Sequence, residues 1–226
     1  MTLSAAVVAL LAGVVVWVLL ATRLTARPWE TPGSPEDVPA GLAPGVPPAK
    51  IGLAFLLGVI TSLFGLFLSA YWMRMEHAHG DWQPLNVPRL LWLNTATLIL
   101  SSALMQWALV AARRARAGRM RVAWIAAGVL AFAFLAGQLV AWHQLQELGY
   151  FVASSPASAF FYLLTGAHGL HLLGGLIVWG KTVVRMVQPD VEVIDLCLSV
   201  ELCTVYWHFL LLVWAVLFAV LLYSHR

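Results

Sequence analysis

Residues 158–180 read SAFFYLLTGAHGLHLLGGLIVWG and contain no Asp, Glu, Lys or Arg. As a helix, a stretch of this length can cross the ~30 Å hydrocarbon core of a bilayer. A second run, residues 198–223, reads LSVELCTVYWHFLLLVWAVLFAVLLY and carries a single acid, Glu201. Such runs belong in lipid, where only helices and closed barrels satisfy every backbone polar group. The two runs therefore predict a helical membrane protein.

The composition extends this prediction to the whole chain. Of the 226 residues, 62% are hydrophobic and 10% are charged, against ~45–50% and ~25% in soluble domains. Four further stretches are long and apolar enough to span a membrane, namely residues 3–22, 51–73, 90–112 and 122–143. The predicted fold is all-α, a polytopic transmembrane bundle of about six helices. Its expected parts are an N-terminal transmembrane helix at residues 1–23, a Pro-rich linker at 24–50 and the main bundle at 51–226.

Basic residues predict the orientation of the helices in the membrane. The loop Arg113–Arg121 holds five arginines, whereas residues 144–158 hold no Lys or Arg. Cytoplasmic loops are enriched in Lys and Arg, so we expect the arginine loop to be cytoplasmic and both chain termini to lie outside. The net charge of +3 comes largely from this loop, and it therefore indicates orientation rather than nucleic-acid binding.

Polar residues within the last two runs form the candidate functional site. Inserting an ionisable group at the centre of a membrane helix costs about 2.5–3.5 kcal/mol. We therefore expect each such group to have a polar partner or a functional role. Helical spacing places His168 and His171 on one face with Thr165, and it aligns Glu201, Thr204 and His208 on the next run. We expect these two stripes to meet as an interhelical polar cluster in which Glu201 pairs with a histidine.

Three interpretations of this cluster stay open. It can lock two helices by hydrogen bonds, hold a metal ion or haem through its histidines, or relay protons or a substrate. Small residues of the same run, Gly166, Gly169 and Gly174 with Gly175 beside it, predict close packing against another helix, and Trp207 completes this packing motif. No GxSxG, P-loop, CxxC or HExxH motif occurs, so hydrolase, nucleotide and zinc-peptidase functions have no support.

Four ordered blocks resemble the cytochrome c oxidase subunit III (haem–copper oxidase subunit III) family. They are PRLLWLNTATLILSS at 88–102, Gly137-Gln138 with Trp142, Leu145 and Gly149, FFYLLTGAHGLH at 160–171 with Gly174, and ELCTVYWHFLLLVW at 201–214. The third and fourth blocks, about thirty residues apart, are the most specific. The similarity covers residues ~50–226.

The resemblance implies a non-catalytic subunit of a respiratory terminal oxidase in the bacterial inner membrane. Such a complex passes electrons from cytochrome c or quinol to oxygen and pumps protons. By resemblance, haem and copper lie in the partner subunits I and II, and this chain has neither a metal site nor catalytic residues of its own. It is expected to pack on the catalytic subunit, retain phospholipid and support proton uptake. The cluster of His168, His171, Glu201, Thr204 and His208 would be its polar interhelical set.

Two positions depart from the pattern of the family. Many members carry an acid in the helix that corresponds to residues 51–73, where this sequence has none, and an acid often found after the YWHF histidine is Leu211 here. These differences leave open a divergent type of oxidase, or an accessory subunit of nitric oxide reductase with the same fold. A small proton-coupled transporter also stays open, as does a stand-alone haem protein with His171 and His208 as axial ligands.

Overall fold

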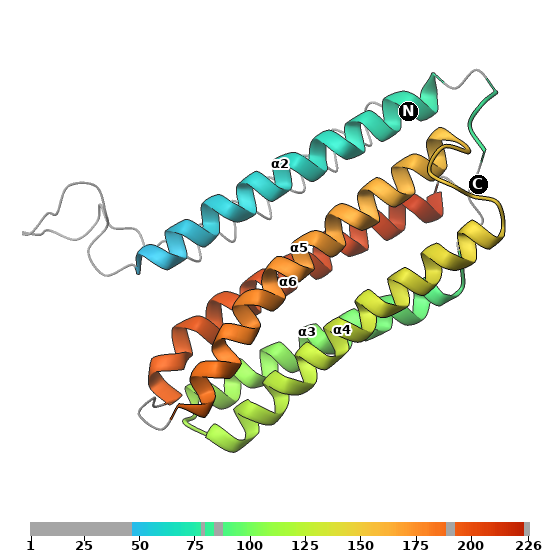
Figure 1. Cartoon of the computed structure of the whole chain (residues 1–226). Helices are drawn as coiled ribbons and strands as arrows, with labels where there is room; N and C mark the ends of the chain where they lie inside the picture. The colour runs from blue at the N-terminus through green and yellow to red at the C-terminus, as the bar shows by residue number, and fades with distance from the viewer. Residues whose placement is uncertain (1–46, 78–79, 84–87, 189–192, 224–226) are drawn as a thin grey trace, which may run out of the picture. The chain divides into compact units, whose positions relative to one another are not determined.

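The structure is a computed structural model of the chain, and it describes residues 47–77, 80–83, 88–188 and 193–223. These residues contain no strand, and their regular elements are all α-helices (Figure 1). The helices are α2 (Pro48–Glu76), α3 (Leu90–Arg113), α4 (Ala117–Glu147), α5 (Pro156–Val187) and α6 (Val193–Tyr223). The prediction of an all-α helical bundle is thereby confirmed. The predicted first helix at 1–23 lies outside the described residues, as does most of the linker at 24–50, so this division stays a prediction.

Each described helix contains a segment that is long and apolar enough to cross a membrane. Helices of 24 residues (α3) to 32 residues (α5) are about 36–48 Å long, which exceeds the hydrocarbon thickness of ~30 Å. The chain is a multi-pass membrane protein. The sides on which its loops and termini lie stay predictions.

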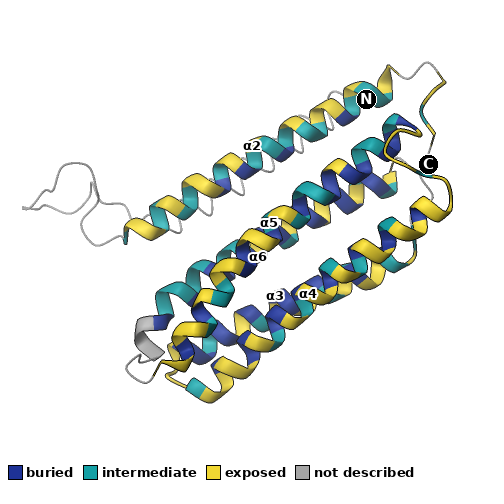
Figure 2. Ribbon diagram, in the orientation of Figure 1, coloured by how far each residue is buried: buried dark blue, intermediate teal, exposed yellow. Residues whose placement is uncertain are grey.

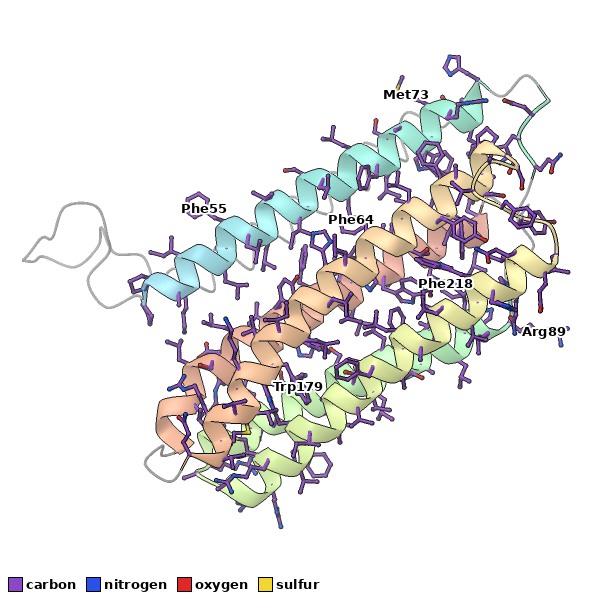
Figure 3. The ribbon with its side chains drawn as sticks, viewed as in Figure 1. Phe55, Phe64, Met73, Arg89, Trp179 and Phe218 are labelled. Atoms are coloured by element: carbon purple, nitrogen blue, oxygen red, sulfur yellow. The ribbon has the colours of Figure 1, made fainter. Side chains whose placement is uncertain are left out.

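The chain divides into two compact units after Met73, and α2 is described by itself. Leu57, Ile60, Phe64 and Tyr71 are buried along one side of this helix. They recur at intervals of three, four and seven residues, which place them on one face. Phe55, which is 70% exposed, lies on the opposite face from Phe64 (Figure 3). The buried side chains of α2 therefore lie on one face of the helix, although both of its faces are apolar.

Helices α3 to α6 form the packed part of the second unit. Helix α3 packs against α4 and α6, and α5 packs against α6 and α4. Buried residues gather on the faces that these helices turn toward one another (Figure 2). The largest side chains without exposed surface are Trp124, Trp207, Trp214, Phe134 and Phe161. The outward faces are apolar as well, with Ile99, Val129 and Ile177 about half exposed or more, as expected of surfaces in contact with lipid.

Short connections join α3 to α4 and α4 to α5. Helix α3 ends with the amide of Arg116 donating to the carbonyl of Ala111 at 2.9 Å, while Ala115 adopts a positive φ of 54°, so that α4 begins at once. Helix α5 starts at Pro156, and Ser155 caps it by accepting from the amide of Ser158 at 3.2 Å. Proline at the first helical position and serine before it are both favourable. The tight α3–α4 turn brings these two helices side by side along their length.

Candidate functional site

The contact between α6 and α3 is built from side-chain hydrogen bonds. The indole N–H of Trp207 donates to Ser101 Oγ at 3.1 Å, and Ser101 in turn donates to the carbonyl of Ala127 on α4 at 2.8 Å. Two turns along α6, the indole N–H of Trp214 donates to Thr95 Oγ1 at 2.9 Å. Trp207 and Ser101 are fully buried. Buried polar groups require partners of this kind, so these bonds fix the rotation of α6 against α3.

His208 lies at the surface of the same contact. Its Nδ1 is hydrogen bonded to Ser102 Oγ, and its Nε2 lies 3.1 Å from Gln106 Oε1. Because an amide oxygen can only accept, a neutral His208 ring carries its proton on Nε2 and accepts at Nδ1 from the Ser102 hydroxyl. Ser102 is buried, whereas His208 and Gln106 are exposed in the isolated chain.

His168 lies at the centre of the four-helix unit and has no exposed surface. Its ring centroid is 5.8 Å from that of Phe134 on α4 and 5.2 Å from that of Trp214 on α6. Neither ring nitrogen has a hydrogen-bond partner among the described residues. Within the same part of the chain, Gln138 Nε2 and Oε1 and Asn94 Nδ2 are buried and also unpartnered.

His171 and Gly175 form the contact of α5 with α6. The Tyr206 hydroxyl donates to the carbonyl of His171 at 2.9 Å, and the ring of His171 bonds the carbonyl of Ala167 within its own helix at 2.7 Å. A Cβ added to Gly175 would lie 2.8 Å from the Tyr206 ring and 2.9 Å from the Trp207 ring. The absence of a side chain at Gly175 is thus what lets the two aromatic rings reach α5.

Glu201 and Thr204 extend the α3–α6 contact toward the arginine loop. Glu201 lies 3.8 Å from Arg113, the last residue of α3. The Thr204 hydroxyl lies 2.7 Å from the carbonyl of Val200 and 3.3 Å from that of Met105 on α3. A histidine partner was expected for Glu201 from the sequence, and the ion pair described for it is with Arg113.

The predicted residues are therefore spread over several contacts of the bundle. His208, Thr204 and Glu201 have partners on α3, His171 borders α6, and His168 is packed between α4 and α6.

The glycines of α5 also differ from one another. Cβ positions at Gly166 and Gly169 lie at ordinary contact distances of 3.5 Å from Trp142 and 3.6 Å from Leu135. Gly174 faces open space in this chain, and the close approach is at its neighbour Gly175.

Several residues that form hydrogen bonds between helices were not predicted from the sequence. Gln106 is one, although its spacing of four from Ser102 places both on one face of a helix and could have suggested it. Trp179, labelled in Figure 3, is another. Its indole N–H donates to the carbonyl of Trp124 at 2.9 Å. Gly128 leaves room for this indole, because a Cβ there would collide with the ring. A bond to a backbone carbonyl of another helix leaves no sequence signal.

Metal-ligating side chains are dispersed in the part of the chain that the structure describes. There, no three side chains of the His, Cys, Asp and Glu types come together in a group that could hold a metal ion. Cys197 and Cys203 are free thiols. The polar contacts described above, such as those of His208 with Ser102 and Gln106, are instead hydrogen bonds between helices.

This fold and this site define a class: a polytopic membrane subunit whose polar side chains join helices. Comparison with known proteins gives the family. The family model of cytochrome c oxidase subunit III matches residues 52–225, and the chain belongs to this family. Its sequence blocks at residues 88–102, 160–171 and 201–214 lie within the matched range, and the resemblance stated from them is confirmed.

Individual relatives agree with the family model. A probable cytochrome c oxidase subunit 3 of Nocardia farcinica is 31% identical over 174 residues, which cover 75% of this chain and 85% of the relative. A probable cytochrome c oxidase subunit 3 of Mycobacterium bovis is 32% identical, covering 70% and 78%. A cytochrome c oxidase subunit 3 of Synechocystis is 29% identical over 209 residues, covering 87% and 88%. The chain is thus a subunit of an oxidoreductase complex, and it assembles with the other subunits of that oxidase.

Proposed function

We propose that this chain is a non-catalytic structural subunit of the oxidase. It packs on the catalytic subunit through the exposed face that α3 and α6 share. The observation that carries this proposal is the pair of His208 and Gln106, here called the His208–Gln106 pair. Both side chains are exposed in the isolated chain, and they are hydrogen bonded to each other at 3.1 Å.

The depth of this pair in the membrane supports a protein partner. His208 lies near the middle of the 31 residues of α6, about 22 Å from either end of the helix. Polar groups at that depth are costly in lipid and almost always face protein or a water-filled cavity. Gln106 and Ser102 together satisfy both ring nitrogens of His208, but Gln106 keeps amide N–H groups that can donate to a partner subunit. A protein surface with complementary acceptors fits this face better than acyl chains do.

We propose that redox chemistry belongs to the partner subunits, with haem and copper in the catalytic subunit I and the copper-bearing subunit II. The match of this chain to the subunit III family supports this part of the proposal. This chain would then support proton uptake by the complex through packing, with no redox centre of its own. The relatives are named as subunits of cytochrome c oxidase, and they do not favour a nitric oxide reductase accessory subunit or a small proton-coupled transporter.

Phospholipid retention is the second part of the proposal. Large apolar side chains are exposed along α3, α4 and α5, among them Leu93, Val129 and Ile177 with exposed fractions of 64%, 58% and 62%. At the start of α3, Arg89 (Figure 3) is exposed, and so is Trp92. This combination is typical of the interface between lipid headgroups and acyl chains. These surfaces suit bound lipid, whereas the His208–Gln106 pair suits protein.

Co-purification tests the proposed interface. We expect His208→Leu and Gln106→Leu to reduce the haem-bearing subunit recovered with the tagged chain by about 3- to 20-fold, because a polar interhelical bond in membranes is worth about 0.6–1.7 kcal/mol. Val129→Leu on α4 is the matched control, as it alters an exposed side chain away from this face. Recovery of an unchanged amount of haem with both leucine variants would show that this face meets lipid and would overturn the assignment. Lipid mass spectrometry on the same preparations, and proton uptake by vesicles that contain the complex, test the other two parts.

A further inference from the structure

Three helices of the second unit each contribute a buried polar side chain with unpartnered atoms. They are Asn94 on α3, Gln138 on α4 and His168 on α5, with exposed fractions of 3%, 3% and 0%. Among the described residues no hydrogen-bond partner exists for Asn94 Nδ2, for either amide atom of Gln138 or for either ring nitrogen of His168. These three residues are called the buried polar layer below.

Contacts around Gln138 place it at the level of His168. Along α4, Gln138 lies one helical turn from Phe134 and one turn from Trp142, on the same face as both. Phe134 contacts His168 with ring centroids 5.8 Å apart, and the Trp142 indole donates to Thr165 at 3.1 Å. Gln138 therefore faces α5 between Thr165 and His168.

Asn94 is linked to the same level from the other side. Its Oδ1 lies against Gly137, the residue that precedes Gln138. The next residue of α3, Thr95, accepts the indole bond of Trp214 at 2.9 Å, and the Trp214 ring is 5.2 Å from that of His168. The three side chains thus belong to one cross-section of the bundle, with Phe134 and Trp214 as its aromatic walls.

The chemistry of the unpartnered atoms indicates what they can bind. Gln138 and Asn94 offer amide N–H donors, Gln138 also offers a carbonyl acceptor, and a neutral imidazole offers one donor and one acceptor. An anion requires donors and a metal ion requires acceptors, whereas this set mixes the two. Water both donates and accepts, and buried polar groups without protein partners typically bind it. All three residues are buried and the rings of Phe134 and Trp214 lie beside His168, which favours a small ligand such as water.

We propose that the buried polar layer of Asn94, Gln138 and His168 binds internal water molecules within the four-helix unit. These waters join α3, α4 and α5 through polar atoms that have no direct hydrogen-bond partner among the described residues. The inference concerns the interior of the chain and is independent of the proposed interface on α3 and α6.

Water-edited solid-state NMR on the ¹⁵N-labelled full-length chain in lipid bilayers tests this proposal. We expect magnetisation from water protons to reach the ring nitrogens of His168 well before it reaches the Trp207 indole nitrogen. Trp207 is the internal control, because it is equally buried and its N–H is bonded to Ser101. Transfer to His168 no faster than to Trp207 would overturn the proposal, as would a direct through-space contact between the Gln138 amide and His168 without water transfer.

A pair of variants locates the water. Gln138→Leu removes two of the unpartnered atoms at little change in size, and we expect it to abolish most of the water transfer to His168. Gln146→Leu, near the exposed end of the same helix, should leave that transfer unchanged. A Gln138→Leu chain that folds and keeps the full transfer would place the water elsewhere and contradict the assignment. If that variant does not fold, the measurement on the native chain still decides between the two outcomes.

Discussion

Helix α6 is held to its two neighbours by different means. Against α3 it makes a series of side-chain hydrogen bonds, in which Trp207 donates to Ser101 and Trp214 donates to Thr95. Against α5 it makes a close approach at Gly175, where rings of Tyr206 and Trp207 occupy the space a side chain would need. One contact depends on polar partners and the other on the absence of a side chain.

The difference follows from what drives association in lipid. Apolar side chains gain little by leaving acyl chains for one another, so helices associate through close packing, hydrogen bonds or both. Trp207 takes part in each contact, since its N–H reaches α3 while its ring lies against α5. The two contacts are therefore coupled through one residue, and variants that affect only one of them can separate their contributions.

The largest effect is expected at the close approach. Gly175→Leu would place a side chain where the Tyr206 and Trp207 rings now lie, and overpacking of this kind typically costs about 1–3 kcal/mol. Rigid rings on a packed helix have little room to move, so we expect the upper part of that range. Unfolding of the purified chain in mixed detergent micelles, followed by tryptophan fluorescence, measures the change.

The adjacent glycine provides the matched control. Gly174 faces open space in this chain, so Gly174→Leu should leave the stability of the isolated chain within error of the wild type. Equal destabilisation by the two substitutions would mean that the register of α5 against α6 differs from the one described. A Gly174→Leu chain that is stable alone but fails to enter the complex would show that this position packs against another subunit.

A smaller loss is expected at the hydrogen-bonded contact. Ser101→Ala removes the acceptor of the Trp207 indole and the donor to the carbonyl of Ala127. Interhelical hydrogen bonds in membranes average about 0.6 kcal/mol and reach about 1.7 kcal/mol, and two are lost here, so we expect a loss of about 1–2 kcal/mol. Thr97→Ala is the control on the same helix, because its hydroxyl bonds only the carbonyl of Leu93 in its own helix. If Ser101→Ala destabilised the chain no more than Thr97→Ala does, hydrogen bonding would not be the main interaction between α3 and α6.

Sequence patterns were enough to predict the helices, whereas they did not determine which residues the polar side chains meet on neighbouring helices. The runs at 90–112 and 158–180 fall within α3 and α5, because apolar length is a local property that lipid enforces. Spacing also placed Thr165 and His168 on one buried face. The spacing of residues along one helix does not determine which other helix its polar face contacts. That depends on how four helices are ordered and rotated around one another, and it is why Glu201 has Arg113 as a described partner where a histidine was expected.

Loss of the hydrogen bond between Tyr206 and α5 is expected to change the stability least. The Tyr206 hydroxyl donates to the carbonyl of His171, one turn before Gly175 on α5. That carbonyl also accepts the backbone N–H of its own helix, so Tyr206→Phe leaves no orphaned acceptor and keeps the ring in place. We expect a loss of about 0.5 kcal/mol or less in the same micelle assay. If Tyr206→Phe proved as costly as Gly175→Leu, the α5–α6 contact would depend on hydrogen bonding as the α3–α6 contact does. An effect close to zero would instead support close packing as the main interaction between α5 and α6.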